Sequence, residues 1–428
     1  MKIIRGKQIN MFLKSLKTRL VAGGGVEPAV RKILEDVRRN GNRALKKYTE
    51  KFDSVKITSF LISKKELASA ADKADKKVVR ALEVSARRII AFHKKQKEKS
   101  WTFFENGITL GQIIRPIERA GVYIPGGKAS YPSTVLMTVI PTLVAGVKEI
   151  ALCMPTPGGV INPYSASAIR ILGLNEVYKI GGAQAVGAMA FGTETIRKVD
   201  KIAGPGNIYV ATAKRLVFGE VDIDMIAGPS EVLIIADKTA DPSFIAADLL
   251  SQSEHDEMAS AILITDSGLL AKNVAQELAS QLTALKRKAI AKKSLGKYGA
   301  IIIVKGINDA FDIANKIAPE HMEIMTSNPK RYLTEVKHAG AIFLGKWSPE
   351  PLGDYSAGPN HTLPTGGTAR FSSPLGVYDF VKRSSLIDFR REGFMRLANT
   401  VKTLADAEGL EAHGNTIRVR MGKVTCKV

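Results

Sequence analysis

Cysteine and long apolar runs are scarce in this 428-residue sequence, and each absence narrows the classes of protein to consider. The only two cysteines, Cys153 and Cys426, have no neighbours at metal-binding or redox spacing, which argues against thiol chemistry and favours a reducing, cytoplasmic setting. The longest apolar run, residues 135–147, is interrupted by threonine and proline and is too short to span a bilayer. The basic first 20 residues lack the apolar centre of a signal peptide. We therefore expect no membrane partner.

Acidic residues are also few, since 41 Asp and Glu face 63 Lys and Arg and leave a net charge of +22. Such a charge can indicate nucleic-acid binding. Residues 1–100, however, hold 27 basic and 10 acidic residues, a net +17, so the other 328 residues carry only +5. The excess of basic residues is not accompanied by a zinc finger, by aromatic residues placed among the basic ones, or by a Gly-rich RNA-binding signature. The charge is typical of a solvated helix surface, and nucleic acid is disfavoured as a partner.

What the sequence does contain is the pattern of an α/β protein with more than one domain. Apolar spacing predicts helices over residues 27–48 and 64–99, then short strands over 101–123 around a turn at 105–107. Beyond residue 376 the pattern is helical and mixed, and ends in a strand-like segment at 416–420.

Between these ends, strands and helices alternate in two series that are separated by residues 227–230. Repeated units of this kind predict two parallel sheets covered by helices, with ligands beyond the carboxyl ends of the strands. The first series has strands at 122–124, 149–154, 176–180 and 201–203, and helices at 134–145, 165–174, 183–191 and 208–217. The second has strands at 232–236, 261–265, 300–304, 322–325 and 341–344, and helices at 243–254, 307–317 and 329–338.

Glycine-rich turns at 181–182 and 204–207 each stand between a predicted strand and a helix. Glycine there allows the backbone to approach a phosphate at a helix amino terminus. Neither turn has the GxGxxG spacing, so ordinary turn chemistry remains an alternative to dinucleotide binding. Gln184 and Asn207 offer amide groups for a ribose or a phosphate.

Gln252, His255, Asp354 and His413 are candidate metal ligands. Gln252 and His255 are three residues apart and would share one helix face, although such a pair alone is more typical of a solvated surface. The four residues supply oxygen and nitrogen without sulfur, which suits Zn²⁺, or else Mn²⁺ or Co²⁺. Since they come from three distant segments, their spacing leaves the presence of a metal open.

Glu320 and His321 are candidate bases. The side chains of adjacent residues point apart in an extended chain, so the two would act as separate bases in two steps, although each could also be a structural polar residue.

His361 lies in a loop of Gly, Pro and Ser that is expected to order on binding a ligand. His338 sits on a plain predicted helix and His93 on a Lys-rich one, and both are assigned structural roles.

Together these segments resemble the histidinol dehydrogenase family, and the matches run essentially from end to end in the family's order. The matching stretches are residues 119–127 (RAGVYIPGG), 181–185 (GGAQA), 201–207 (KIAGPGN), 227–232 (AGPSEV), 252–255 (QSEH), 319–323 (PEHME) and 353–361 (GDYSAGPNH), followed by Glu408 and His413.

The resemblance implies oxidation of L-histidinol through L-histidinal to L-histidine with two NAD⁺, the last step of histidine biosynthesis. It implies zinc ligands at Gln252, His255, Asp354 and His413, and acid–base roles for Glu320 and His321. It implies NAD contacts at Tyr123, Gln184 and Asn207, and substrate contacts at Ser230, Gln252, His255, His321, Asp354, His361, Glu408 and His413.

The implied architecture is an intertwined homodimer of two Rossmann-like parallel-sheet domains with small helical extensions at both ends. The implied ranges are 1–20 with 376–398 for a small helical segment, 21–120 with 231–375 for the zinc and catalytic domain, 121–230 for the NAD domain, and 399–428 for a tail that reaches the partner's site. Glu408 and His413 would then act in the other subunit.

Three other functions stay open at this point. A family relative could oxidise a different amino or hydroxy alcohol, and a zinc hydrolase could use Glu320, although glycine turns in two α/β series fit a dinucleotide better. A basic nucleic-acid-binding protein is the non-enzymatic alternative. The strong basic charge of the amino-terminal helices departs from the family's pattern, but these basic residues lie outside the matched motifs.

Overall fold

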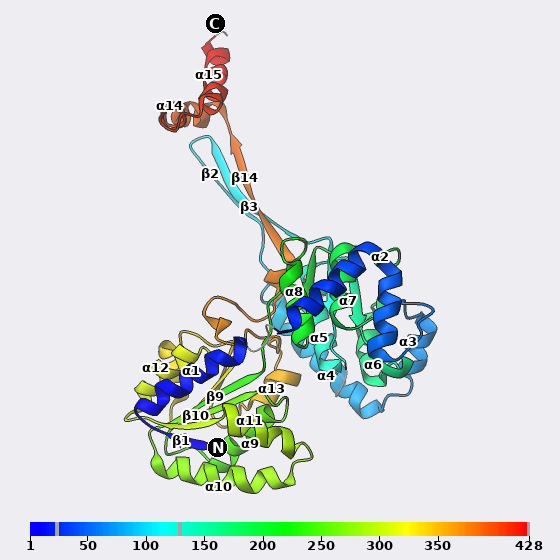
Figure 1. Ribbon diagram of the computed structural model, residues 1–428. Helices are drawn as coiled ribbons and strands as arrows, with labels where there is room; N and C mark the ends of the chain where they lie inside the picture. The colour runs from blue at the N-terminus through cyan, green and yellow to red at the C-terminus, as the bar shows by residue number, and fades with distance from the viewer. Residues whose placement is uncertain (22–24, 127–130, 426–428) are drawn as a thin grey trace. The chain divides into compact units, whose positions relative to one another are not determined.

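The structure is a computed structural model that describes residues 1–21, 25–126 and 131–425, so Gly127 of the first matching stretch and Cys426 lie outside the described residues. Its contacts separate into two compact units. One consists of Met1–Gln96 and Ile117–Phe380, and the other of Lys97–Pro116 and Val381–Val428 (Figure 1). The first unit contains two parallel sheets, which confirms the predicted α/β class.

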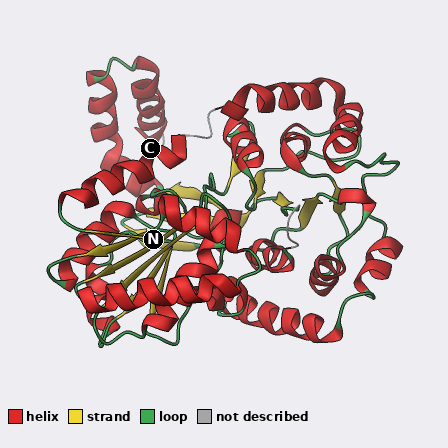
Figure 2. Ribbon diagram, turned by 60° about the horizontal axis from the view of Figure 1, so that its bottom comes forward, coloured by secondary structure: helices red, strands yellow, loops and turns green. Residues whose placement is uncertain are grey.

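The larger sheet has six parallel strands in the order β1-β11-β10-β9-β12-β13. Successive side chains of β9 point to opposite faces, so Val232 and Ile234 meet α9, α10 and α11, whereas Leu233 and Ile235 meet α1 and α12. Helices cover both faces of the sheet (Figure 2). The elements are β1 (Lys2–Ile4), β9 (Glu231–Ala236), β10 (Ser260–Thr265), β11 (Ala300–Ile303), β12 (His321–Met325), β13 (Ala341–Leu344), α1 (Lys7–Val21), α9 (Pro242–Ser253), α10 (Gly268–Ala284), α11 (Lys288–Tyr298), α12 (Ile307–Ile317), the 3₁₀ helix η3 (Pro329–Glu335) and α13 (Glu350–Tyr355).

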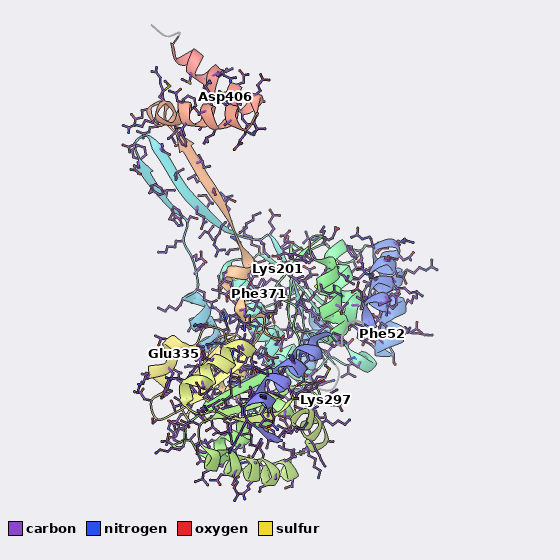
Figure 3. The ribbon with its side chains drawn as sticks, turned by 60° about the vertical axis from the view of Figure 1, so that its left-hand side comes forward. Phe52, Lys201, Lys297, Glu335, Phe371 and Asp406 are labelled. Carbon is purple, nitrogen blue, oxygen red and sulfur yellow. The ribbon has the colours of Figure 1, made fainter. Side chains whose placement is uncertain are left out.

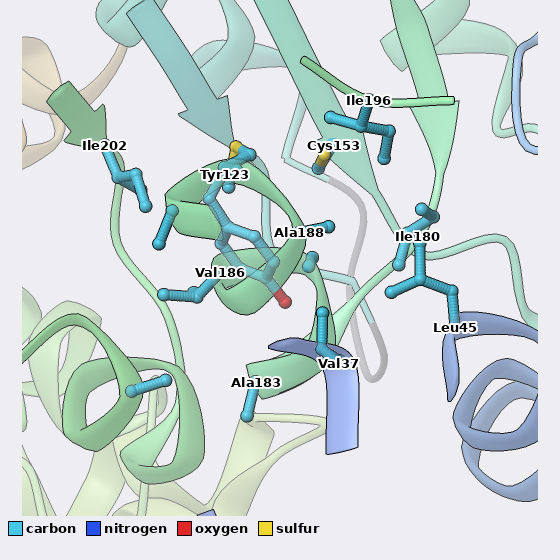
Figure 4. Close-up of a cluster of buried hydrophobic side chains, with 14 of the residues drawn as sticks. Val37, Leu45, Tyr123, Cys153, Ile180, Ala183, Val186, Ala188, Ile196 and Ile202 are labelled. Atoms are coloured by element: carbon cyan, nitrogen blue, oxygen red, sulfur yellow. The ribbon is translucent and has the colours of Figure 1, made fainter. Parts of the chain in front are cut away.

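The second sheet has five parallel strands in the order β6-β5-β4-β7-β8. Its buried core joins Tyr123 and Cys153 of the strands to Val37 and Val186 of the covering helices (Figure 4). The elements are β4 (Arg119–Tyr123), β5 (Glu149–Met154), β6 (Val177–Lys179), β7 (Lys201–Ala203), β8 (Asp222–Ile223), α2 (Glu27–Asp53), α3 (Lys64–Ala71), α4 (Lys76–Lys94), α5 (Pro132–Ala145), α6 (Pro163–Leu172), α7 (Gly182–Phe191) and α8 (Ile208–Val217).

The amino-terminal segments pack differently from the domain ranges predicted for residues 1–20 and 21–120. β1 pairs with β11, so the first residues extend the larger sheet. α2 packs on α7 and α8, while α3 and α4 pack on α6 and α5, so these helices belong with the smaller sheet. The single helix predicted over 64–99 is wrong because Ser63 and Asp75 each cap a separate helix with their side chains.

The second unit is an antiparallel sheet in the order β14-β3-β2 with two helices. The predicted helical segment at 376–398 instead contains β14, which pairs with β3 along its whole length. The strand-like segment predicted at 416–420 is wrong, since those residues lie in α15, where Arg418 pairs with Asp406 of α14 at 2.7 Å. Figure 3 labels Asp406. The elements are β2 (Trp101–Glu105), β3 (Ile108–Pro116), β14 (Val381–Phe389), α14 (Arg391–Ala407) and α15 (Glu411–Thr425).

Candidate active site

Polar residues gather at the amino ends of β9 and β12, two neighbouring strands of the larger sheet. His321 opens β12 opposite Val232, and Glu320 directly precedes it. The Glu320 Oε2 atom accepts the Glu231 N–H at 2.8 Å. The candidate residues of this sheet therefore lie at its amino edge and not beyond the carboxyl ends of its strands, because α9 runs back from the end of β9 and brings Gln252 to the amino edge.

His321 is held as a neutral base with a defined tautomer. Its Nδ1 lies 2.9 Å from the Glu231 carbonyl oxygen, and because a carbonyl only accepts, Nδ1 must carry the proton. Burial lowers the pKa of His321; nearby Asp354 raises it, and the other two histidines that face it, His255 and His361, lower it further. The lone pair is therefore on Nε2, which lies 3.9 Å from the Glu350 Oε1 atom.

The short helix α13 brings two carboxylates to His321. Candidate ligand atoms of His321, Glu350 and Asp354 all lie within 4.8 Å of one another. The Glu350 N–H donates to Glu323 Oε1 at 2.8 Å, which anchors the start of α13 to β12. Burial, followed by the neighbouring Asp354, raises the pKa of Glu350 to about 10, which keeps this carboxyl protonated near neutral pH.

Glu350 was missed by the sequence reasoning. A signal for it exists, because Glu350 and Asp354 are four residues apart and therefore share one face of a helix. The helix has only 6 residues, too few for its periodicity to be recognised.

Of the predicted zinc ligands, Gln252 and Asp354 are on helices of the first unit. Gln252 is only 1% exposed, and its Oε1 atom has no hydrogen-bond partner among the described residues. A buried amide oxygen without a partner is unusual and fits a metal ligand. The predicted same-face pair is corrected, since α9 ends at Ser253 and His255 lies beyond it in an exposed turn.

His361 connects the site to the smaller sheet. Its Nδ1 lies 3.0 Å from the Asp354 carbonyl oxygen, and its Nε2 lies 3.3 Å from Thr134 Oγ1 on α5. Ser230, half-buried directly before β9, accepts a hydrogen bond from the Ser260 N–H through its carbonyl.

The remaining histidines and the carboxyl-terminal residues lie elsewhere. His93 is fully buried in α4, with its Nδ1 atom 2.9 Å from the Ile89 carbonyl oxygen. His338 follows η3 and is not on a helix, contrary to its prediction. Glu408 and His413 belong to the second unit, where both are exposed.

The three predicted NAD residues lie at the carboxyl ends of strands of the smaller sheet, which is where the sequence pattern predicts a ligand. Tyr123 ends β4, and its hydroxyl accepts the Gly182 N–H at 3.0 Å. Gln184, in the first turn of α7, is 1% exposed, and its Oε1 atom lacks a hydrogen-bond partner within the described part of the chain. Asn207 caps α8 by accepting the N–H groups of Tyr209 and Val210, so only its Nδ2 end can serve a ligand.

Comparison with known proteins places this arrangement in a family. The sequence model of histidinol dehydrogenase matches residues 18–421. The chain belongs to the histidinol dehydrogenase family. It is 52% identical over 400 residues to the histidinol dehydrogenase of Syntrophotalea carbinolica, covering 93% of each chain. It is 55% identical over 396 residues to that of Aquifex aeolicus, covering 92% of each chain.

A solved structure agrees with the sequence matches. The crystal structure of histidinol dehydrogenase from Elizabethkingia anophelis superposes with a TM-score of 0.91 at 40% identity, covering 94% of this chain and 93% of that one. As a member of the histidinol dehydrogenase family, the protein is an oxidoreductase of histidine biosynthesis. Among the described residues, no helix has the length and apolar character needed to cross a membrane.

Proposed function

We propose that the protein oxidises L-histidinol to L-histidine through L-histidinal, with two NAD⁺ as hydride acceptors and Zn²⁺ in the site. The observation that carries the proposal is the neutral His321, fixed by Glu231 and set beside the two carboxyl groups of α13. A neutral imidazole with its lone pair on a defined nitrogen can accept an alcohol proton near neutral pH.

Four side chains would hold the zinc ion. Gln252 offers a buried oxygen without a partner among the described residues, Asp354 a carboxylate, and His255 an imidazole close enough to influence the pKa of His321. His413, from a second copy of the chain, would complete this nitrogen and oxygen donor set, which suits zinc. When bound, the ion would hold the imidazole and amine of the substrate and so fix its alcohol carbon.

His321 and Glu320 would serve successive oxidations. In the first, Nε2 of His321 takes the hydroxyl proton while a hydride leaves the carbinol carbon for NAD⁺, which gives the aldehyde. In the second, Glu320 takes a proton from water as the oxygen adds to the aldehyde, and a hydride then leaves the hydrate. The Glu231 N–H orients the Glu320 carboxylate for this role. Glu350, whose carboxyl lies within 4.8 Å of the candidate ligand atoms of His321 and Asp354, would contact the bound substrate.

The nicotinamide dinucleotide would bind at the carboxyl ends of the smaller sheet. Gln184 supports this because a ribose hydroxyl would supply the partner that its buried Oε1 lacks among the described residues. The helix amino termini behind Gly182 and Asn207 would face the phosphates. Ser230 and His361, and Glu408 from the second copy, would contact the substrate. A homodimer in the cytoplasm is part of the proposal.

The stoichiometry of NADH production tests the proposal. NADH would be counted per molecule of L-histidinol before chelation, after chelation and after zinc restoration. We expect two NADH, loss on chelation and recovery with zinc. One NADH with release of the aldehyde would contradict the role of Glu320. Activity on another amino alcohol without activity on histidinol would show a different substrate.

A further inference from the structure

A fully buried ion pair lies beneath the proposed dinucleotide site. Lys214 of α8 contacts Asp224, which directly follows β8, and their side chains are 2% and 0% exposed. Both also bind one glycine. Lys214 Nζ donates to the Gly204 carbonyl oxygen at 2.9 Å, and Asp224 Oδ2 accepts the Gly204 N–H at 2.8 Å.

The position of Gly204 has no room for a side chain. Its φ of +124° lies in the region that favours glycine, and an added Cβ would clash with the Tyr123 carbonyl oxygen. The residue therefore presses directly against the end of β4 while its N–H and carbonyl are held by opposite charges. Gly204 opens the turn that ends at Asn207, the cap of α8.

The network links the carboxyl ends of β4, β6 and β7 at this edge of the sheet. Gly204 begins the turn after β7 and packs on Tyr123 at the end of β4. The Tyr123 hydroxyl in turn accepts the N–H of Gly182, in the turn after β6. The position of each turn is thus linked to the ion pair through a short series of hydrogen bonds and backbone packing contacts.

A gain in folding stability does not by itself explain why this ion pair is buried. Removing two charges from water is costly, and apolar residues of similar volume are often as stabilising or more so. What an apolar pair could not do is hold both the N–H and the carbonyl of Gly204, because it has neither a donor nor an acceptor.

We propose that Lys214 and Asp224 are positioning residues for the dinucleotide, fixing Gly204 and through it the glycine turns that hold NAD⁺. The inference rests on the proposed function, since it assumes that NAD⁺ binds at this edge. Neither side chain touches the dinucleotide. The two side chains act only by fixing the positions of the backbone N–H groups in the glycine turns.

The test variant replaces both charged side chains with apolar ones, Lys214→Met with Asp224→Leu, so that Gly204 loses both partners and no unpaired charge is buried. Asp224→Leu is avoided as a single change because it would leave the lysine without its counter-charge. A displacement of a binding group by ~1 Å can reduce the rate by up to about 100-fold. We expect KM for NAD⁺ to rise about 10-fold or more, and KM for L-histidinol to change less than about twofold.

The matched control is Lys201→Met, which breaks a second lysine–aspartate pair of the same sheet. Lys201 Nζ lies 2.8 Å from Asp222 Oδ2 at the opposite, amino end of β7. It contacts no part of the Gly204 network, so KM for NAD⁺ should stay at the wild-type value. Lys214→Arg keeps a charged donor for the Gly204 carbonyl, so its KM for NAD⁺ should lie between those of the wild type and the double variant.

Circular dichroism and thermal unfolding would show that each variant is folded before the kinetics are compared. A folded double variant with an unchanged KM for NAD⁺ would overturn the proposal, as would an equal rise in KM for both substrates. If the double variant does not fold, Asp224→Glu replaces it, since this change keeps the charge and shifts the Gly204 N–H contact. A wild-type enzyme that shows no saturation with NAD⁺ would instead refute the proposed function.

Discussion

Replacing Asp248 with asparagine should stabilise the protein above neutral pH, and the structure gives the size of the effect. Asp248 lies on α9 and is 8% exposed, and it is close to Glu323 of β12, which is 1% exposed. Burial raises the pKa of Asp248 from its ordinary 3.8 to about 6. Burial and then the nearby Asp248 raise the pKa of Glu323 well above its ordinary value.

The sign of the effect follows from these directions. A carboxyl whose pKa is higher in the folded protein than in the unfolded chain binds more protons when folded, so folding becomes less favourable as pH rises between the two values. For Asp248 that window runs from 3.8 to about 6. At about 1.4 kcal/mol per pH unit, the free energy of unfolding falls by about 3 kcal/mol across it.

Asparagine does not titrate, and its Nδ2 can donate to Glu323. Asp248→Asn should therefore match the wild type near pH 4 and exceed its free energy of unfolding by up to about 3 kcal/mol at pH 8. Urea unfolding at pH 4.5, 6 and 8, at one protein concentration, would measure the difference. Asp312→Asn, an exposed change on α12, is the control and should show no such trend. A difference that does not vary with pH, or a less stable variant at pH 8, would refute the reasoning.

Three further predictions concern activity and backbone geometry. Glu320→Gln keeps an oxygen for the Glu231 N–H but cannot take a proton from water. Single-turnover assays should show aldehyde accumulating and the second oxidation about 100- to 10,000-fold slower; two NADH at the normal rate would contradict this. Mixing subunits with His413→Ala and subunits with Glu320→Ala should restore about a quarter of wild-type activity after random exchange, because half of the dimers become hybrids with one intact site. No recovery after proven exchange would disprove shared sites. Gly204→Ala should lower the free energy of unfolding by about 3 kcal/mol or more in denaturant titration, through its positive φ and the clash with Tyr123.

Local sequence patterns predicted most elements that are continuous and buried. The helix at 307–317 and the strand at 149–154 occur with the predicted bounds, because the helix has apolar residues at three- and four-residue spacing and the strand is a short apolar run. The segment at 381–389 could not be read in this way. It becomes β14 only by pairing with β3, which lies more than 260 residues earlier in the chain. The spacing of apolar residues within a segment does not reveal a distant partner strand.

The place of the candidate site residues in the fold could not be predicted from the sequence. The histidine and amide candidates were chosen from motifs and family resemblance, whereas their gathering at the amino edge depends on how far α9 runs back along the sheet. In the smaller sheet the candidate residues do lie at the carboxyl ends of strands, since Tyr123 ends β4 and Gln184 is in the first turn of α7. The buried pair of Lys214 and Asp224 belongs to no motif, and only the fold shows that both side chains meet Gly204.

The direction of the covering helices gives the two sheet edges opposite electrical character. In a parallel sheet, helices return from the carboxyl ends of strands, so each helix begins at one edge and finishes at the other. α9 finishes beside Gln252, where the carbonyls of its last turn amount to about half a negative charge. α7 and α8 begin behind Gly182 and Asn207, where their amides amount to about half a positive charge. A cation at the first edge and pyrophosphate at the second would each meet a backbone field of the favourable sign.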